Sequence, residues 1–168
     1  MAKLNSLKDL FKDQLKVLYY SEKEFLDTLN KVEDKVSSDE LKNQINQLCN
    51  DTEGQVKRLE EVFSKVEMES EGKKCPAMDG VIDEINEVIN EDADPKVIDA
   101  AIIAEIQKGI HFKIASYGTL KTYAKMLNFS QVADRMKETI QEEKNTDKKF
   151  TEIADRVNQE ANVSSSEF

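Results

Sequence analysis

Two glutamates and one lysine interrupt helical patterns that are otherwise apolar. In steps of four and three residues, Glu22 is the only charged member of an eight-position pattern, and Lys113 and Glu143 interrupt two later patterns. A buried carboxylate is costly unless it is paired or bound to a metal. We therefore expect Glu22 and Glu143 to meet a cation in the core. The patterns are Phe11, Leu15, Leu18, Glu22, Phe25, Leu29, Val32 and Val36; Leu41, Ile45, Leu48, Thr52, Gln55, Leu59, Val62 and Val66; Ile103, Ile106, Ile110, Lys113, Tyr117, Leu120, Ala124 and Leu127; and Met136, Ile140, Glu143, Asp147, Phe150 and Val157 around Ala154.

These polar interruptions are expected to share one level of the folded chain. A reversal between the first two helices places Glu22 beside Glu53, and a reversal between the last two places Glu143 beside residue 115, close to Lys113. Random errors in four patterns would have no reason to coincide in this way. The coincidence predicts one polar layer in the middle of the fold.

Four long helices must position this layer, at about residues 6–36, 39–67, 95–127 and 130–160. Asn5 or Ser6 can cap the first helix, and a capping box of Ser37 with Glu40 would end it and begin the second. Pro95 suits the first turn of the third helix after a cap at Asp94, and Ser130 can cap the fourth. We expect one domain over residues 1–160 and a frayed tail over residues 161–168.

The connections predict the topology. Short turns make each neighbouring pair of long helices antiparallel, whereas about 27 residues with a short amphipathic helix separate the second and third long helices. A segment of this length can cross the whole bundle. The predicted fold class is therefore all-α, a ferritin-like four-helix bundle with one long crossover that carries a short extra helix.

Composition excludes several function classes. The formal charge of −10, without a basic run, argues against binding to nucleic acid. We expect neither a membrane span nor a signal peptide, and hence a cytoplasmic protein. Cys49 and Cys75 form no CxxC motif and are expected to stay reduced.

Five segments resemble the YciF/YciE family of ferritin-like bacterial stress proteins, over about residues 5–157. They are LFKDQLKVLYYSEKEFLDTL, TEGQVKRLEEVF, KKCPAMDGVI, ASYGTLKTYAKML and ETIQEEKNTDKKFTEIA. The resemblance implies a compact four-helix bundle with an additional short helix, usually dimeric. It also implies induction under stress and no well-defined reaction.

The dimetal site of ferritin-like proteins needs a Glu from each of two helices and a Glu-x-x-His from each of the other two. Relatives often read Glu-His-Tyr-Glu where residues 110–113 read Ile-His-Phe-Lys here, and they often carry a histidine on the second helix, where Leu48 and Gln55 stand. The chain contains no Glu-x-x-His. The ligand set is therefore depleted, and we expect no cofactor. If iron or manganese binds, the candidate ligands are Glu22, Glu143, Asp147, Glu53 and His111.

The ammonium of Lys113 offers a second way to neutralise Glu22 and Glu143, because it can replace the charge of a metal. In a third arrangement, Lys113 extends to water while Ile114 faces inward. The two glutamates would then accept hydrogen bonds from Thr52, Gln55 or a tyrosine hydroxyl. The residues alone leave these alternatives open.

Two function classes remain. The first is a non-catalytic, ferritin-like stress-response protein whose metal site has degenerated into an ion pair. The alternative is an iron or manganese oxidoreductase, or a metal-binding protein, with an atypical carboxylate-rich site. We favour the first class and expect a homodimer joined through an apolar face such as Leu26, Phe63 and Val66.

Overall fold

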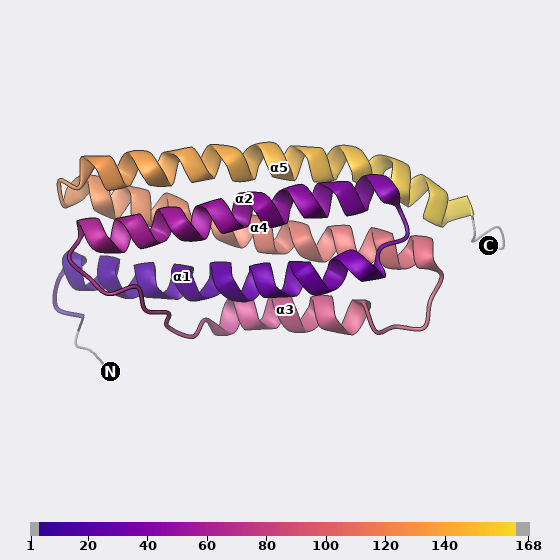
Figure 1. The fold of residues 1–168 in the computed structure, drawn as a ribbon, viewed down its shortest axis with the longest axis horizontal. Coiled ribbons are helices and arrows are strands. Elements are labelled where there is room, and N and C mark those ends of the chain that lie inside the picture. The colour runs from indigo at the N-terminus through magenta and orange to yellow at the C-terminus, as the bar shows by residue number, and fades with distance from the viewer. Residues whose placement is uncertain (1–3, 164–168) are drawn as a thin grey trace.

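The computed structural model describes residues 4–163 and is helical throughout its regular structure, with no strand in that range. Four long helices lie alongside one another, and a short helix lies outside them (Figure 1). The elements are α1 (Leu7–Val32), the 3₁₀ turn η1 (Glu33–Lys35), α2 (Asp39–Lys65), α3 (Pro76–Val88), α4 (Pro95–Met126) and α5 (Ser130–Val163).

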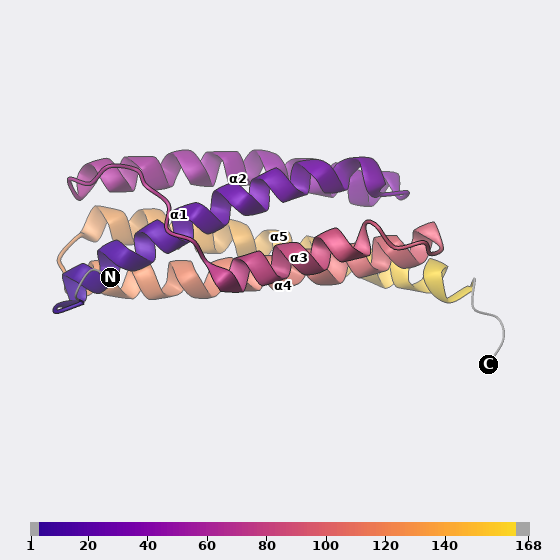
Figure 2. The ribbon, with the colours of Figure 1, turned by 90° about the horizontal axis from the view of Figure 1, so that it is seen from below.

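The long helices form two antiparallel hairpins, α1 with α2 and α4 with α5 (Figure 1). Helix α1 also packs against α4, and α2 packs against α5, which closes the bundle. Helix α3 returns the chain along the outside of α1 and α4, as Figures 1 and 2 show, so that α2 and α4 run in the same direction. The predicted all-α fold with one crossover is confirmed.

Local sequence signals set most of the helix starts. The Ser6 side chain accepts a hydrogen bond from the backbone N–H of Asp9, and Asp94 caps α4 in the same way, with Pro95 in the first turn. Asn128, with φ of 60°, makes the sharp turn between α4 and α5. These starts lie where the sequence predicts them.

The predicted capping box of Ser37 with Glu40 is wrong. Helix α1 ends at Val32, before η1, and Ser38 is the residue that caps α2. Ser37 instead donates from its backbone N–H and its hydroxyl to the carboxylate of Asp99, at 2.9 and 2.7 Å. Asp99 is buried and also accepts a hydrogen bond from the backbone N–H of Ser38 at 2.8 Å. Because a buried carboxylate requires hydrogen-bond donors, Ser37 donates to Asp99 and does not cap α2.

The core consists of two apolar clusters separated by a polar layer. One cluster contains Phe25 and Ile110 among its members, and the other contains Leu18 and Leu59. Between them lie buried polar side chains from α1, α2, α4 and α5, which are Ser21, Glu22, Thr52, Gln55, Lys113, Thr139, Glu143 and Thr146. The predicted polar layer at mid-bundle is therefore present.

The predicted inner face of the last helix needs correction. Ile140, Asp147 and Ala154 are only half-buried, and the residues immediately before them, Thr139, Thr146 and Ile153, are buried instead. Helix α5 is thus rotated by part of a turn relative to the expectation, although Glu143 and Phe150 still face inward. The helix also extends to residue 163, three residues beyond its predicted end, and the remaining predicted tail, residues 164–168, lies outside the described residues.

Within the described part of the chain, no helix combines the length and the apolar character needed to cross a membrane.

Candidate functional site

Lys113 lies at the centre of the polar layer, and its side chain is completely buried. Its Nζ lies 3.0 Å from Glu22 Oε2 and 3.0 Å from Glu143 Oε1, and it donates to Gln55 Oε1 at 2.9 Å. These acceptors come from α1, α5 and α2. The contacts with Gln55 and Glu143 are hydrogen bonds, and the contact with Glu22 is an ion pair. The arrangement is the ion pair considered above, and Lys113 does not reach water.

Helical periodicity explains why Lys113 faces inward. Ile106, Ile110, Tyr117 and Leu120 lie on the same face of α4, at spacings of three, four and seven residues, and all are buried. Ile114, the residue that would face inward after a small rotation of the helix, is only half-buried. The apolar neighbours of Lys113 therefore fix its direction.

Glu22 has one hydrogen-bond donor and one ion-pair partner, which sequence analysis considered only in general terms. The Tyr117 hydroxyl donates to Glu22 Oε1 at 2.6 Å, and Lys113 faces the other carboxylate oxygen. Burial raises the pKa of Glu22, and the charge of Lys113 only partly offsets it. Thr52, a predicted partner, has no hydrogen-bond partner for its hydroxyl among the described residues.

Lys113 is in direct contact with two buried carboxylates, those of Glu22 and Glu143. Burial by itself lowers the pKa of Lys113, but Glu143 and Glu22 outweigh this effect and leave the pKa raised. The ammonium therefore stays charged. Each of the two glutamates has one oxygen, Oε2, that accepts no hydrogen bond from residues 4–163, while Glu143 Oε1 accepts from both Lys113 and Gln55.

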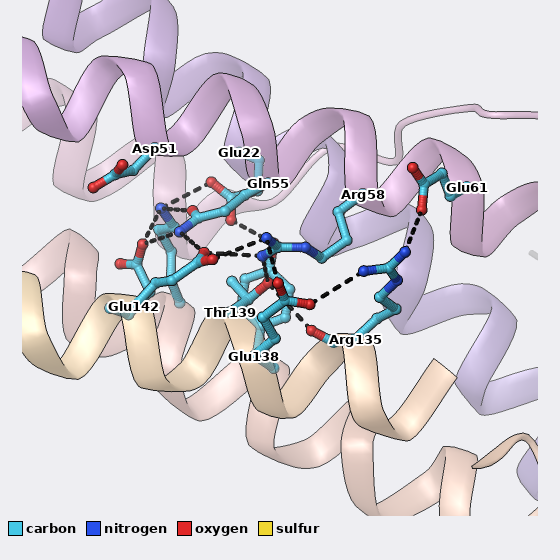
Figure 3. Close-up of polar contacts among 12 residues, drawn as sticks. Glu22, Asp51, Gln55, Arg58, Glu61, Arg135, Glu138, Thr139 and Glu142 are labelled. Atoms are coloured by element: carbon cyan, nitrogen blue, oxygen red, sulfur yellow. Dashed lines mark hydrogen bonds and ion pairs between the residues drawn. The ribbon is translucent and has the colours of Figure 1, made fainter. Parts of the chain in front are cut away.

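A second ionic group connects this core to the surface between α2 and α5. Both terminal nitrogens of Arg58 donate to the carboxylate of Glu142, at 2.9 and 2.8 Å, and Arg58 also donates to Thr139 at 2.6 Å (Figure 3). Gln55 Nε2 donates to Glu142 at 3.2 Å. Burial alone would raise the pKa of Glu142, but the hydrogen bonds from Arg58 and Gln55 outweigh it and hold the pKa below its usual value.

Sequence analysis missed this Arg58 group, although one signal for it exists. Arg58 follows Gln55 by three residues, so both lie on one face of α2. Glu142 directly precedes the buried Glu143, which places it at the edge of the core. The sequence could not show that Arg58 on α2 faces Glu142 on α5.

An aromatic ring closes the site on the α1 side. The ring of Phe25 lies with its centre 5.5 Å from Lys113 Nζ, within the range of a cation–π interaction. This position requires Gly109 on α4, because a Cβ atom at residue 109 would lie 2.5 Å from the ring. Gly109 therefore admits Phe25 to its place over the lysine.

The other predicted metal ligands lie away from this layer. His111 is exposed on 64% of its side chain and pairs with Asp147, at 3.1 Å between Nε2 and Oδ2. Asp147 also accepts from Gln107, and Glu53 is exposed. Within residues 4–163, no group of three or more His, Cys, Asp and Glu side chains is arranged to hold a metal ion. The structure thus brings together Glu22 and Glu143, and it separates them from His111 and Glu53.

Comparisons with known proteins agree with this architecture. Residues 6–162 match the family described as Domain of unknown function (DUF892). Protein YciF of Escherichia coli strain K12 is 40% identical over 160 residues, which cover 94% of this chain and 96% of that protein.

Two solved structures are similar over most of their length. The crystal structure of the E. coli stress protein YciF superimposes with a TM-score of 0.89 at 36% identity, covering 93% of this chain and 99% of that one. YcfI from Rhodopseudomonas palustris, described as a candidate structural protein, gives a TM-score of 0.86 at 32% identity, covering 89% and 96%. The chain therefore belongs to the DUF892 family, together with YciF.

Proposed function

We propose that this protein is a non-catalytic stress-response protein whose bundle core is completed by the ammonium of Lys113 in place of a metal charge. Its similarity to the E. coli stress protein YciF supports the cellular role. The similarity to YcfI, a candidate structural protein, supports a role that needs no reaction.

The observation that carries the proposal is the full pairing of Lys113. Its Nζ has acceptors at 2.9 to 3.0 Å on α1, α2 and α5, and no part of its side chain reaches water. Because the cation is part of the chain, the two glutamates have a partner without any added ion. The ammonium offsets one of the two carboxylate charges, so the glutamates are not left without a cation when no cofactor is bound.

The donor set does not fit the dimetal centre of ferritin-like proteins. Such a centre needs carboxylates from four helices together with two imidazoles. Here α4 contributes an ammonium, α2 contributes the amide of Gln55, and the chain's one histidine, His111, is exposed. Two divalent ions beside Lys113 would meet a positive charge where they need a ligand.

The alternative is an iron or manganese oxidoreductase that uses Glu22, Glu143, Asp147, Glu53 and His111. These residues would have to converge, whereas His111 pairs with Asp147 at the surface and Glu53 faces solvent. Their placement favours the non-catalytic proposal.

Elemental analysis tests the proposal directly. Protein expressed with added iron and manganese, then purified without chelator, should carry neither metal in stoichiometric amount. A ferritin-like protein with a complete dimetal ligand set, expressed and purified in parallel, is the control for metal supply. About two tightly bound ions per wild-type chain, the content of a dimetal protein, would overturn the proposal.

We further propose that the protein acts in the cytoplasm as a homodimer, as the family resemblance implies. The face predicted from the sequence is wrong, however, because Phe63 and Val66 are buried within the chain. The dimer must therefore use another surface.

A further inference from the structure

A continuous polar path leads from Lys113 to the surface between α2 and α5. Lys113 donates to Gln55. Gln55 in turn donates to Glu142, which also accepts from Arg58 (Figure 3). Accessibility rises along this path, since Lys113 and Gln55 are buried while 17% of the Arg58 side chain and 35% of the Glu142 side chain are exposed. The path thus joins the buried cation to water.

The other sides of the cluster are closed by apolar side chains. The Phe25 ring covers Lys113 from α1, and the Tyr117 side chain is buried beside Glu22. Along the bundle axis the two apolar clusters lie on either side of the polar layer. A small molecule entering there would have to displace packed side chains, whereas between α2 and α5 it meets polar ones.

The seam between α2 and α5 is also hollowed on both sides of Arg58. A hollow of about 370 Å³ lies toward one end, where Gln44 and Gln47 of α2 face Lys149 and Ile153 of α5. A hollow of about 320 Å³ lies toward the other end, beside Lys65 and Arg135. Both hollows are open to solvent and wide enough to hold water. Arg58 bridges the helices at the level between these hollows.

From these three observations we infer that the α2–α5 seam is the entry route for water and small reagents to the Lys113 cluster, and that Arg58 is the latch that closes it. The latch consists of the paired contacts of Arg58 with Glu142, its contact with Thr139 and a longer contact with Glu138 at 3.3 Å. Loss of these contacts leaves Gln55 as the remaining cover over Lys113 on this side. The inference does not depend on whether the protein is catalytic.

Amine labelling measures how readily the α2–α5 seam opens, because a reagent must pass through it to reach Lys113. Native protein is treated with acetic anhydride, and the acetylation rate of Lys113 is determined by peptide mass spectrometry relative to the exposed Lys144 of the same sample. In the wild type Lys113 should react far more slowly than Lys144. In Arg58→Met we expect its relative rate to rise about tenfold, because a local opening becomes cheaper by about 1.4 kcal/mol.

Arg135→Met is the matched control. Arg135 also links the two helices, through Glu61 of α2, and on its own helix it pairs with Glu138, which Arg58 contacts as well (Figure 3). It is 44% exposed and has no contact with Gln55 or Glu142 among the described residues. Its loss should leave the Lys113 rate unchanged. Equal rates in wild type and Arg58→Met, or the same increase in both arginine variants, would overturn the inference.

A second variant keeps the test valid if Arg58→Met does not fold. Glu142→Gln retains Arg58 but removes the charge that holds it, so the relative rate at Lys113 should rise in the same direction. Urea unfolding of each variant separates local from global opening, because global opening would raise labelling at all buried sites together. An increase confined to Lys113 supports the latch, and an increase shared by every buried site contradicts it.

Discussion

The Tyr117 hydroxyl donates a 2.6 Å hydrogen bond to Glu22 across the interface of α4 and α1. Four residues earlier on α4, Lys113 contacts the other oxygen of the same carboxylate. One glutamate is thus held by a hydrogen-bond donor and a cation from successive turns of one helix. This geometry sets the axial position of α1 against α4, because a shift by one turn would leave the buried Tyr117 hydroxyl without its acceptor and separate Glu22 from its cation.

The first prediction concerns the coupling of Lys113 with Glu22. Lys113→Met leaves buried negative charge without its partner, and we expect a loss of about 3 to 5 kcal/mol in the free energy of unfolding. Adding Glu22→Gln should recover part of this loss, because one of the unpaired charges disappears. Urea unfolding of the four proteins in the cycle should give a coupling energy above about 1 kcal/mol. Additive effects of the two changes would contradict the ion pair.

The second prediction concerns pH. Burial raises the pKa of Glu22 above its ordinary value of 4.5, so the folded chain holds this proton more tightly than the unfolded chain does. Its contribution to stability is fully present below pH 4.5 and is lost as the pH rises through the folded pKa. The free energy of unfolding should therefore fall as the pH rises above about 4.5 and through the folded pKa of Glu22.

Urea titrations at several pH values check this expectation, with Glu22→Gln as the comparison. The substitution removes the titrating group, so the decline should become shallower. Glu142 should act in the opposite direction. Because its pKa is lowered, its contribution to the free energy of unfolding is lost as the pH falls. An unchanged slope in Glu22→Gln would show that another group causes the decline.

The sequence allowed the helices and the level of the polar layer to be predicted because both depend on local or periodic signals. Ser6, Asp94 and Pro95 act within one turn of their helices. Glu22 and Lys113 interrupt periodic patterns that hold over many residues. Such features need no knowledge of which helix faces which.

The remaining features depend on contacts between distant segments. Ser37 binds Asp99, which lies 62 residues away, instead of forming the local capping box. Burial of Thr139 in place of Ile140 reflects a rotation of α5 that its own pattern does not determine, because both residues are compatible with an inner face. The pair of Arg58 and Glu142 follows from the same rotation.

The third prediction is that the protein is a dimer at micromolar concentration. It rests on the family resemblance, since relatives usually pair. Sedimentation equilibrium should give twice the mass of one chain. Replacement of Phe63 by Ala should lower stability without a specific effect on association, because this side chain is fully buried within the chain. A monomer across the micromolar range would refute the prediction.

The last prediction concerns the contact of Gly109 with Phe25. A Cβ atom at residue 109 would lie 2.5 Å from the aromatic ring, so Gly109→Ala must displace the ring from its position over Lys113. Overpacking of this kind costs about 1 to 3 kcal/mol, and it outweighs the gain of about 1 kcal/mol that alanine brings to a helix. Gly118→Ala, on the same helix, is the matched control, because its Cβ would meet no atom within 4 Å. We expect Gly118→Ala to raise the midpoint of urea unfolding and Gly109→Ala to lower it. If both substitutions stabilise the protein equally, Phe25 is free to move aside and does not hold the lysine in place.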